Sequence, residues 1–267
     1  MPDVTSDRPS LDVWLSAANH SHRRLVDAVG PLSAEQINGP SYDEEWSIAQ
    51  VLSHLGSSAE IFSMFLRAGR RHEPGPGMDE FTPVWDRWNA KAPEAQVAEA
   101  LVADRQFLDE MHALDEHDRR NWAMALFGAD QKLVDLMQFR LSEHAVHTWD
   151  VVVMADEGAA IAPDATALLV DTLAPLVARV GASTPDPLRV QLHTHDPDRH
   201  FLLVAGGDGA ELGELAQGTA PGADEAVELP AEALIRLFYG RLDPGHTPES
   251  VGGDFDIDAL RRIFTGF

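Results

Sequence analysis

Apolar residues recur at the spacing of an α-helix through much of the first 158 residues of the chain. This pattern predicts four long helices, which cover residues 11–30, 47–69, 93–114 and 132–156. Ser47 and Gln50 have the spacing of a capping box at the start of the second helix. The Gly- and Pro-rich segment at 70–81 is expected to be a loop. Four long helices with intervening loops predict an up-down four-helix bundle, in whose core ligands from facing helices can meet.

The pattern changes towards the C-terminus. One more helix is predicted at 165–180, and after the breaker-rich segment GASTPDP two short strands are predicted at 188–196 and 199–207, around the turn DPDR. A short strand near 226–229 and two amphipathic helices, at 230–242 and 256–264, follow. The predicted fold is therefore a two-domain α+β protein. Residues 1–158 form the bundle, and residues 159–267 form a linking helix and a small C-terminal α+β domain.

The composition narrows the classes of partner. With 44 acidic and 20 basic residues the formal net charge is −24, which disfavours nucleic acid and anionic membrane surfaces as partners. The chain has no cysteine, so any thiol used in chemistry must arrive as a small molecule. The N-terminal ten residues lack an apolar signal core, and no apolar run reaches the length of a membrane span. A cytoplasmic protein without a membrane partner is expected.

The fourth predicted helix carries the first candidate chemistry. Glu143 and His147 are four residues apart, so they lie on the same face of the helix, within its apolar stripe. A carboxylate among apolar residues needs a partner, and the sequence offers a metal, the neighbouring Arg140 or a protonated histidine. His54 lies at the edge of the apolar stripe of the second helix. Two histidines and a carboxylate can hold a divalent metal with open coordination positions, but an ordinary surface pair and a half-buried His54 bonded to a backbone carbonyl also fit the pattern.

Five further histidines have other interpretations. His144 points about 100° away from Glu143, which favours packing or a hydrogen bond to a ligand over direct ligation. His22 lies on the apolar stripe of the first helix and is expected to be a hydrogen-bonded core histidine. His193 and His195 share one strand face, with His200 across the turn. A solvated or hydrogen-bonded hairpin is expected for these three, with a second metal site as the alternative, because the sequence does not firmly place an acidic partner.

Four segments together resemble a known family. They are WSIAQVLSHL, RLSEHAVHTWD, LRVQLHTHDPDRHFLLV, and LFYGRL followed by GGDFDIDALRRIF. The chain resembles the mycothiol-dependent maleylpyruvate isomerases and their relatives. That resemblance implies an N-terminal DinB-like bundle and a C-terminal α+β domain of the sterol-carrier type.

The resemblance also implies a function and a site. His54, Glu143 and His147 would be the ligands of a divalent metal, usually zinc, which activates the thiol of mycothiol or of another low-molecular-weight thiol. The thiol would attack a small electrophile, as in a maleylpyruvate-type cis-trans isomerase or a thiol S-transferase, in a monomer or homodimer. Arg241, in LFYGRL, is the catalytic candidate for orienting a carboxylate of the electrophile, although an arginine at a helix C-terminus also interacts favourably with the helix dipole. The alternative function is a non-catalytic small-molecule binding or regulatory module with a structural or relic metal site.

Overall fold

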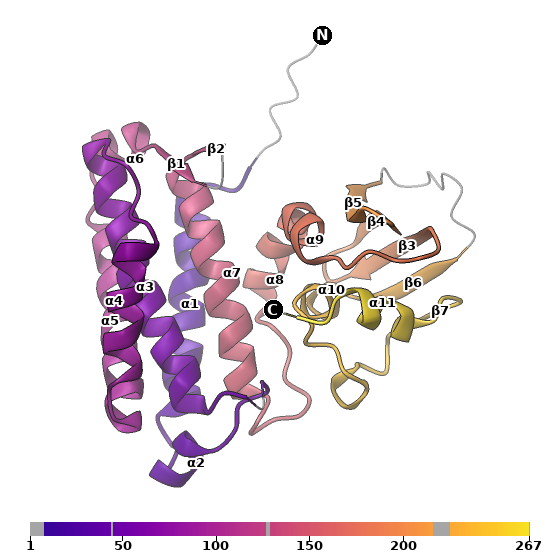
Figure 1. Cartoon of the computed structure of the whole chain (residues 1–267), viewed down its shortest axis with the longest axis horizontal. Helices are drawn as coiled ribbons and strands as arrows, with labels where there is room; N and C mark the ends of the chain where they lie inside the picture. Colours follow the sequence, from indigo (N-terminus) through magenta and orange to yellow (C-terminus); the bar gives the residue numbers. More distant parts are fainter. Residues whose placement is uncertain (1–7, 44, 127–128, 216–224, 267) are drawn as a thin grey trace. The chain divides into compact units, whose positions relative to one another are not determined.

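A computed structural model describes residues 8–43, 45–126, 129–215 and 225–266 of the chain. The chain divides into two units, Met1–Asp156 and Glu157–Phe267 (Figure 1). The first seven of the ten N-terminal residues, for which no apolar signal core is expected, lie outside the described part. None of the helices in the described ranges combines the length and the apolar character that crossing a membrane requires.

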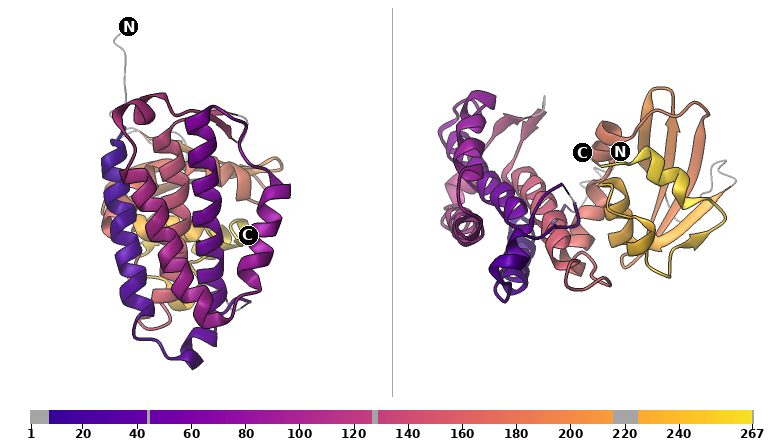
Figure 2. Two further views of the ribbon diagram at one scale, coloured as in Figure 1. Left: turned by 90° about the vertical axis from the view of Figure 1, so that its left-hand side faces the viewer. Right: turned by 60° about the horizontal axis from the view of Figure 1, so that its bottom comes forward.

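The first unit is built on the four long helices that the apolar pattern predicts (Figure 2). These are α1 (Leu11–Val29), α3 (Ile48–Arg71), α5 (Pro93–His112) and α7 (Leu133–Val152). The predicted capping box is confirmed, since the Gln50 amide donates to Ser47 Oγ and the Ser47 amide donates to Gln50 Oε1. This arrangement satisfies two backbone donors and fixes where α3 starts.

The direction of the helices differs from the alternating up-down order that the sequence suggests. Gly56 of α3 lies against Ala100 of α5, and further along both helices Arg67 pairs with Glu110. Residue numbers therefore rise together along α3 and α5, which run parallel as neighbours. Helices α1 and α7 are also parallel neighbours, because Arg8 pairs with Asp135 before α1 begins and Ser21 meets His144 later in it. The prediction of an up-down bundle was wrong in this respect.

An additional helix, α4 (Met78–Asn89), explains the parallel pair. It runs back along α3, as the contacts of Phe81 with Phe65 and of Trp88 with Gly56 show. A Cβ atom on Gly56 would lie 2.3 Å from the Trp88 ring, so only glycine admits this packing. The sequence pattern missed α4 because Pro83 interrupts its hydrogen bonds and a Gly-Pro-Gly segment precedes it. Shorter elements were missed as well: α2 (Ala34–Asn38), α6 (Glu116–Asn121) and the hairpin of β1 (Met124–Leu126) with β2 (Ala129–Gln131).

The second unit begins with helices that form from the predicted segment 165–180. That segment is broken into α8 (Pro163–Leu169), the 3₁₀ turn η1 (Val170–Thr172) and α9 (Ala174–Val180). Pro175 explains the break, because it has no backbone N–H to continue the α-helical hydrogen bonds and it fits the first turn of a new helix.

A five-stranded mixed sheet completes the second unit. Its strand order is β5 (Gly209–Glu214), β4 (Arg199–Gly206), β3 (Leu188–His195), β6 (Ala226–Pro230) and β7 (Gly252–Gly253). The predicted strands correspond to β3, β4 and β6, whereas β5 and β7 were not predicted. Residues of β3 and β4 alternate between a buried face, with Val190, Leu192 and Leu203, and a more exposed face. Phe238, at the end of α10 (Ala231–Phe238), packs against Phe264, just after α11 (Ile257–Ile263), with ring centroids 4.6 Å apart.

Candidate metal centre

The structure brings His54, Glu143 and His147 together across two antiparallel helices. His54 lies on α3, and the other two lie one helical turn apart on α7. Glu143 Oε2 is 3.1 Å from His54 Nε2 and 3.9 Å from His147 Nε2. One potential ligand atom from each of the three residues lies within 4.8 Å of those of the other two. This convergence of two imidazoles and a carboxylate is the arrangement that a divalent ion needs.

A buried aspartate orients one of these histidines. The Nδ1 atom of His147 is 2.9 Å from Asp150 Oδ2, and Asp150 is fully buried. Since a carboxylate only accepts, Nδ1 carries the proton and Nε2, on the side of Glu143, has the lone pair available. A carboxylate behind a histidine is the common outer arrangement of protein metal sites, because it fixes the tautomer and the ring orientation.

The charges of the group also suit a metal ligand set. Burial by itself would raise the pKa of Glu143, but the hydrogen bond from His54 and the charges of His147, His54 and Arg140 outweigh it and lower the pKa to about 2. Burial lowers the pKa of His54, against the opposing effect of Glu143. At neutral pH the carboxylate is therefore ionised and the His54 imidazole neutral, which are the forms that bind a metal.

The group is open to small molecules. The side chains of His54, Glu143 and His147 are 29%, 30% and 15% exposed. Trp46, just before α3, lies beside the two histidines, with ring centroids 5.4 Å from His54 and 6.3 Å from His147. The three donors fit a metal that retains further coordination positions for water or substrate.

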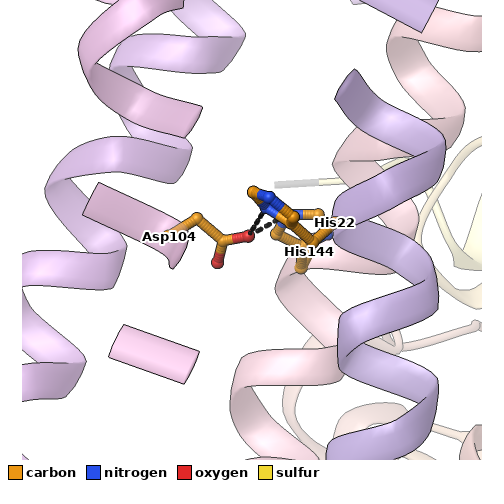
Figure 3. Close-up of side chains that lie close together, drawn as sticks. All are labelled: His22, Asp104 and His144. Atoms are coloured by element: carbon orange, nitrogen blue, oxygen red, sulfur yellow. Dashed lines mark hydrogen bonds and ion pairs between the residues drawn. The ribbon is translucent and has the colours of Figure 1, made fainter. Parts of the chain in front are cut away.

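A second group of the same composition lies in the bundle core (Figure 3). Its members come from three helices: His22 from α1, Asp104 from α5 and His144 from α7. Asp104 Oδ2 is 2.7 Å from His22 Nδ1 and 3.1 Å from His144 Nε2, and all three residues are buried. By its donor types and spacing this group could also bind a divalent metal.

Arg140 distinguishes the buried group from the first one. Its Nη2 is 2.7 Å from Asp104 Oδ1 and also donates to the Leu55 carbonyl oxygen, while Nη1 donates to Ser58 Oγ. The sequence pattern had offered Arg140 as a partner for Glu143, but its ion pair is with Asp104. Burial alone would raise the pKa of Asp104, and the charges of His144 and Arg140 hold it well below the ordinary value.

The two histidines of the buried group behave largely as their positions in the pattern suggest. His22 is a hydrogen-bonded core histidine. His144 Nδ1 lies 2.8 Å from Ser21 Oγ and 3.2 Å from Thr148 Oγ1, and burial lowers the pKa of His144. Asp104 was missed altogether. A signal was present, because Asp104 interrupts the apolar stripe of α5 between Ala100 and Phe107.

Arg241 lies in the second unit, just after α10. It is buried, and its Nη1 donates to the Tyr239 carbonyl oxygen at 2.7 Å. Its predicted role in orienting a substrate carboxylate stays a prediction.

The helical bundle that carries both clusters matches a known protein family. A family model described as the mycothiol maleylpyruvate isomerase N-terminal domain matches residues 18–152, which is half of the chain. The chain belongs to this family. The matched range contains His54, Glu143 and His147, and also the whole buried group. The family predicted from the sequence motifs is thereby confirmed.

Solved structures extend the likeness to both units of the chain. The crystal structure of the mycothiol-dependent maleylpyruvate isomerase is 12% identical, with a TM-score of 0.68 over 92% of this chain and 93% of that one. A histidine-to-alanine mutant of that enzyme is 11% identical, with a TM-score of 0.67 over the same shares. YfiT from Bacillus subtilis, described as a probable metal-dependent hydrolase with an unusual four-helix bundle topology, is 16% identical, with a TM-score of 0.45 over 58% of this chain and 91% of that one. No curated protein matches the chain in sequence. At these identities the likeness establishes an α+β fold with an N-terminal helical bundle.

Proposed function

We propose that this chain is a metal-dependent enzyme that presents the thiol of mycothiol, or of another low-molecular-weight thiol, to a small electrophile. The observation that carries the proposal is the convergence of His54, Glu143 and His147 at a half-exposed point of the bundle, with Asp150 behind His147. A site that only stabilises the fold is usually closed by a fourth protein ligand, whereas a catalytic site keeps a position open.

The buried group is the weaker candidate for the working centre. Its carboxylate already faces the guanidinium of Arg140 at 2.7 Å, and a second positive charge beside Arg140 would be repelled in a medium that screens poorly. Its side chains are also closed to a substrate, because none of the three residues is more than 7% exposed. Charge and access both favour the group around Glu143.

Zinc suits this donor set, because two imidazoles and one carboxylate with open positions form a common catalytic zinc site. When bound, the ion would lower the pKa of a coordinated thiol so that the thiolate is present near neutral pH. Glu143 supplies the negative charge of the site, His54 and His147 supply neutral donors, and Asp150 keeps the His147 ring in position. The lack of cysteine fits a thiol that is supplied as cosubstrate.

The proposed chemistry is an addition. For a maleylpyruvate-type isomerase, the thiolate adds to the carbon–carbon double bond, the resulting single bond rotates, and the thiolate leaves again. For an S-transferase, the carbon–sulfur bond is kept and the carbanion formed at the neighbouring carbon takes up a proton. Arg241 is proposed to orient a carboxylate of the electrophile, for which the planar guanidinium is well suited.

One observation favours a second candidate, a non-catalytic module that binds a small molecule. The second unit contains a cavity of about 520 Å³, with His195, Glu232, Arg236 and His246 among its lining residues. Its volume is in the range of ligand pockets. In this second proposal the C-terminal unit is of the sterol-carrier type and the metal has only a structural role.

Metal content and thiol chemistry together decide between the candidates. Metal would be measured by plasma mass spectrometry in the chain purified without chelator and in the His54→Ala and Glu143→Ala variants, with Asp104→Asn as the matched control from the buried group. About one equivalent of metal is expected in the parent and in the folded fraction of the control, with loss in both ligand variants. Mycothiol with maleylpyruvate would then be assayed by absorbance. Metal binding at this site without turnover of any thiol and electrophile pair would favour the module, and no metal after reconstitution would overturn the enzyme proposal.

A further inference from the structure

The outward face of the sheet in the second unit carries a second set of convergent donors. His193 of β3 and His200 of β4 are direct cross-strand partners. Both lie on the face opposite the buried Leu192 and Phe201, and their rings are stacked with centroids 4.2 Å apart and planes 13° apart. The backbone pairing therefore holds two imidazoles side by side at the end of the hairpin.

The turn between the strands supplies the acidic partner that the sequence did not place. Asp198 Oδ1 is 3.1 Å from His193 Nε2 and 3.3 Å from His200 Nε2. A tetrahedral ion with ligands at about 2.0–2.1 Å separates its donor atoms by about 3.3–3.4 Å. The two nitrogen–oxygen separations are close to this spacing, and one donor atom of each residue lies within 4.8 Å of the others.

A second carboxylate stands behind one of the histidines. Glu228 of β6 is the parallel-strand partner of His193, and its Oε1 lies 4.0 Å from His193 Nδ1. At this distance Glu228 makes no hydrogen bond to the ring, but its negative charge lies beside the imidazole and favours a bound cation.

The local charges do not oppose a cation. Arg199, which follows Asp198 in the sequence, pairs with both carboxylate oxygens of Asp171 at 2.6 and 2.9 Å, and its Nη1 donates to the Asp198 backbone carbonyl oxygen at 2.8 Å. The turn itself is fixed by a hydrogen bond from Thr194 Oγ1 to the Pro197 carbonyl oxygen. The donors are thus held on a rigid strand pair in a locally acidic region.

We propose that His193, Asp198 and His200 form a second divalent-metal site, on the C-terminal sheet and independent of the proposed function of the bundle. Imidazole nitrogens select Zn²⁺, Ni²⁺ or Cu²⁺ over Mg²⁺ or Ca²⁺. Bound there, the ion cross-links β3, the turn and β4, and its remaining positions face solvent. The alternative is that the two histidines only share the carboxylate of Asp198 and bind no metal.

The test uses zinc chloride and the full-length chain carrying His54→Ala, which removes a ligand of the bundle site. Isothermal titration would compare this background with three added substitutions: His200→Gln, Asp198→Asn and His195→Gln. His195 is the matched control, because it lies on the same strand with 47% of its side chain exposed, against 42% for His193, and is outside the cluster. We expect zinc binding in the background chain, weakened by about tenfold or more in the first two variants and unchanged in the control.

Two results would overturn the proposal: no zinc binding in the background chain, or equal affinities in all three variants. Circular dichroism and metal-free melting temperatures would verify folding, and His193→Gln gives an independent variant if one of the others unfolds. Because the background already lacks His54, failure here leaves the proposed bundle site untouched. If the bundle site proves to bind no metal, the titration of the hairpin site is likewise unaffected.

Discussion

Helix α7 contributes to two clusters of two histidines and one carboxylate, and the clusters differ in what balances the carboxylate. Asp104 in the core meets His22, His144 and the guanidinium of Arg140. Glu143, at the half-exposed surface, has its ion pairs within the described residues with His54 and His147. The same donor types therefore serve different purposes. The ion pair with Arg140 makes Asp104 part of the fold, whereas under the proposed function Glu143 is a metal ligand.

The two clusters are also linked through the backbone. Arg140 donates to the carbonyl oxygen of Leu55, the residue after His54, and Arg140 itself lies one turn before Glu143. The buried cluster thus fixes α3 against α7 next to the positions from which His54 and Glu143 meet. Variants that affect stability and metal binding separately test whether the two clusters have these different roles.

The largest effect is expected for Asp104→Asn. Removing the charge leaves Arg140 buried without its ion-pair partner, and the free energy of unfolding should fall by about 3–5 kcal/mol. Urea denaturation monitored by circular dichroism would measure the change. The folded protein should still hold its metal, and loss of metal with unchanged stability would reverse the roles given to the two clusters.

Glu143→Gln should show the opposite behaviour. We expect metal affinity to fall by more than about 100-fold, because a direct ligand contributes more than the outer partners of such sites do. Thiol turnover should fall with it, while the metal-free stability should change far less than in Asp104→Asn, because Glu143 is partly exposed. Dialysis against a zinc-buffered solution would give the affinity. Full metal content in this variant would contradict the assignment.

Asp150→Asn should have an intermediate effect on the same site. The residue does not ligate but orients His147, so metal affinity should drop by about 10- to 100-fold. The same dialysis experiment applies, with Asp43→Asn, a partly exposed surface substitution, as control. An unchanged affinity would mean that the His147 ring is positioned by its packing alone.

The smallest effect is a dependence of metal-free stability on pH. The pKa values of His54 and His144 are lowered in the folded chain, so below about pH 6.5 the unfolded chain binds protons that the folded chain does not. Stability should therefore fall as the pH is lowered from 7 to 5, by at most about 1.4 kcal/mol per pH unit for each histidine. The lowered pKa of Glu143 adds a further loss below about pH 4.5. Urea unfolding at several pH values would measure the slope, and a stability that rises towards pH 5 would be inconsistent with neutral His54 and His144 in the folded chain.

The sequence predicted the long helices well, because each has a continuous apolar stripe that a 3.6-residue period detects. It did not predict the parallel pairing of α3 with α5, because that pairing depends on α4. The Pro83 residue in α4 disfavours a helix in the sequence pattern, whereas packing against Gly56 stabilises that helix in the structure. The half-exposed cluster was proposed from local spacing on α7 and from family motifs. The core cluster was not proposed, because its members come from three helices and have no common spacing in the sequence.

The hairpin cluster shows the same limit at shorter range. The alternation of β3 and β4 places His193 and His200 on one face, but their approach to Asp198 depends on how the turn folds back. Sequence periodicity predicts which face of a strand a side chain lies on, whereas the conformation of the connecting loop determines which side chains from the loop approach that face.

The position of Trp46 has a practical consequence. The centroid of an indole ring lies 5.4 Å from that of His54 and 6.3 Å from that of His147, so the chain carries a natural chromophore within a few ångströms of the candidate centre. Paramagnetic ions such as Cu²⁺ or Ni²⁺ placed there would quench its emission, and a Trp46→Phe variant would isolate that signal from the other five tryptophans. Occupancy of the site, and displacement by an incoming thiol, would then be visible optically in the unlabelled protein, on the timescale of mixing.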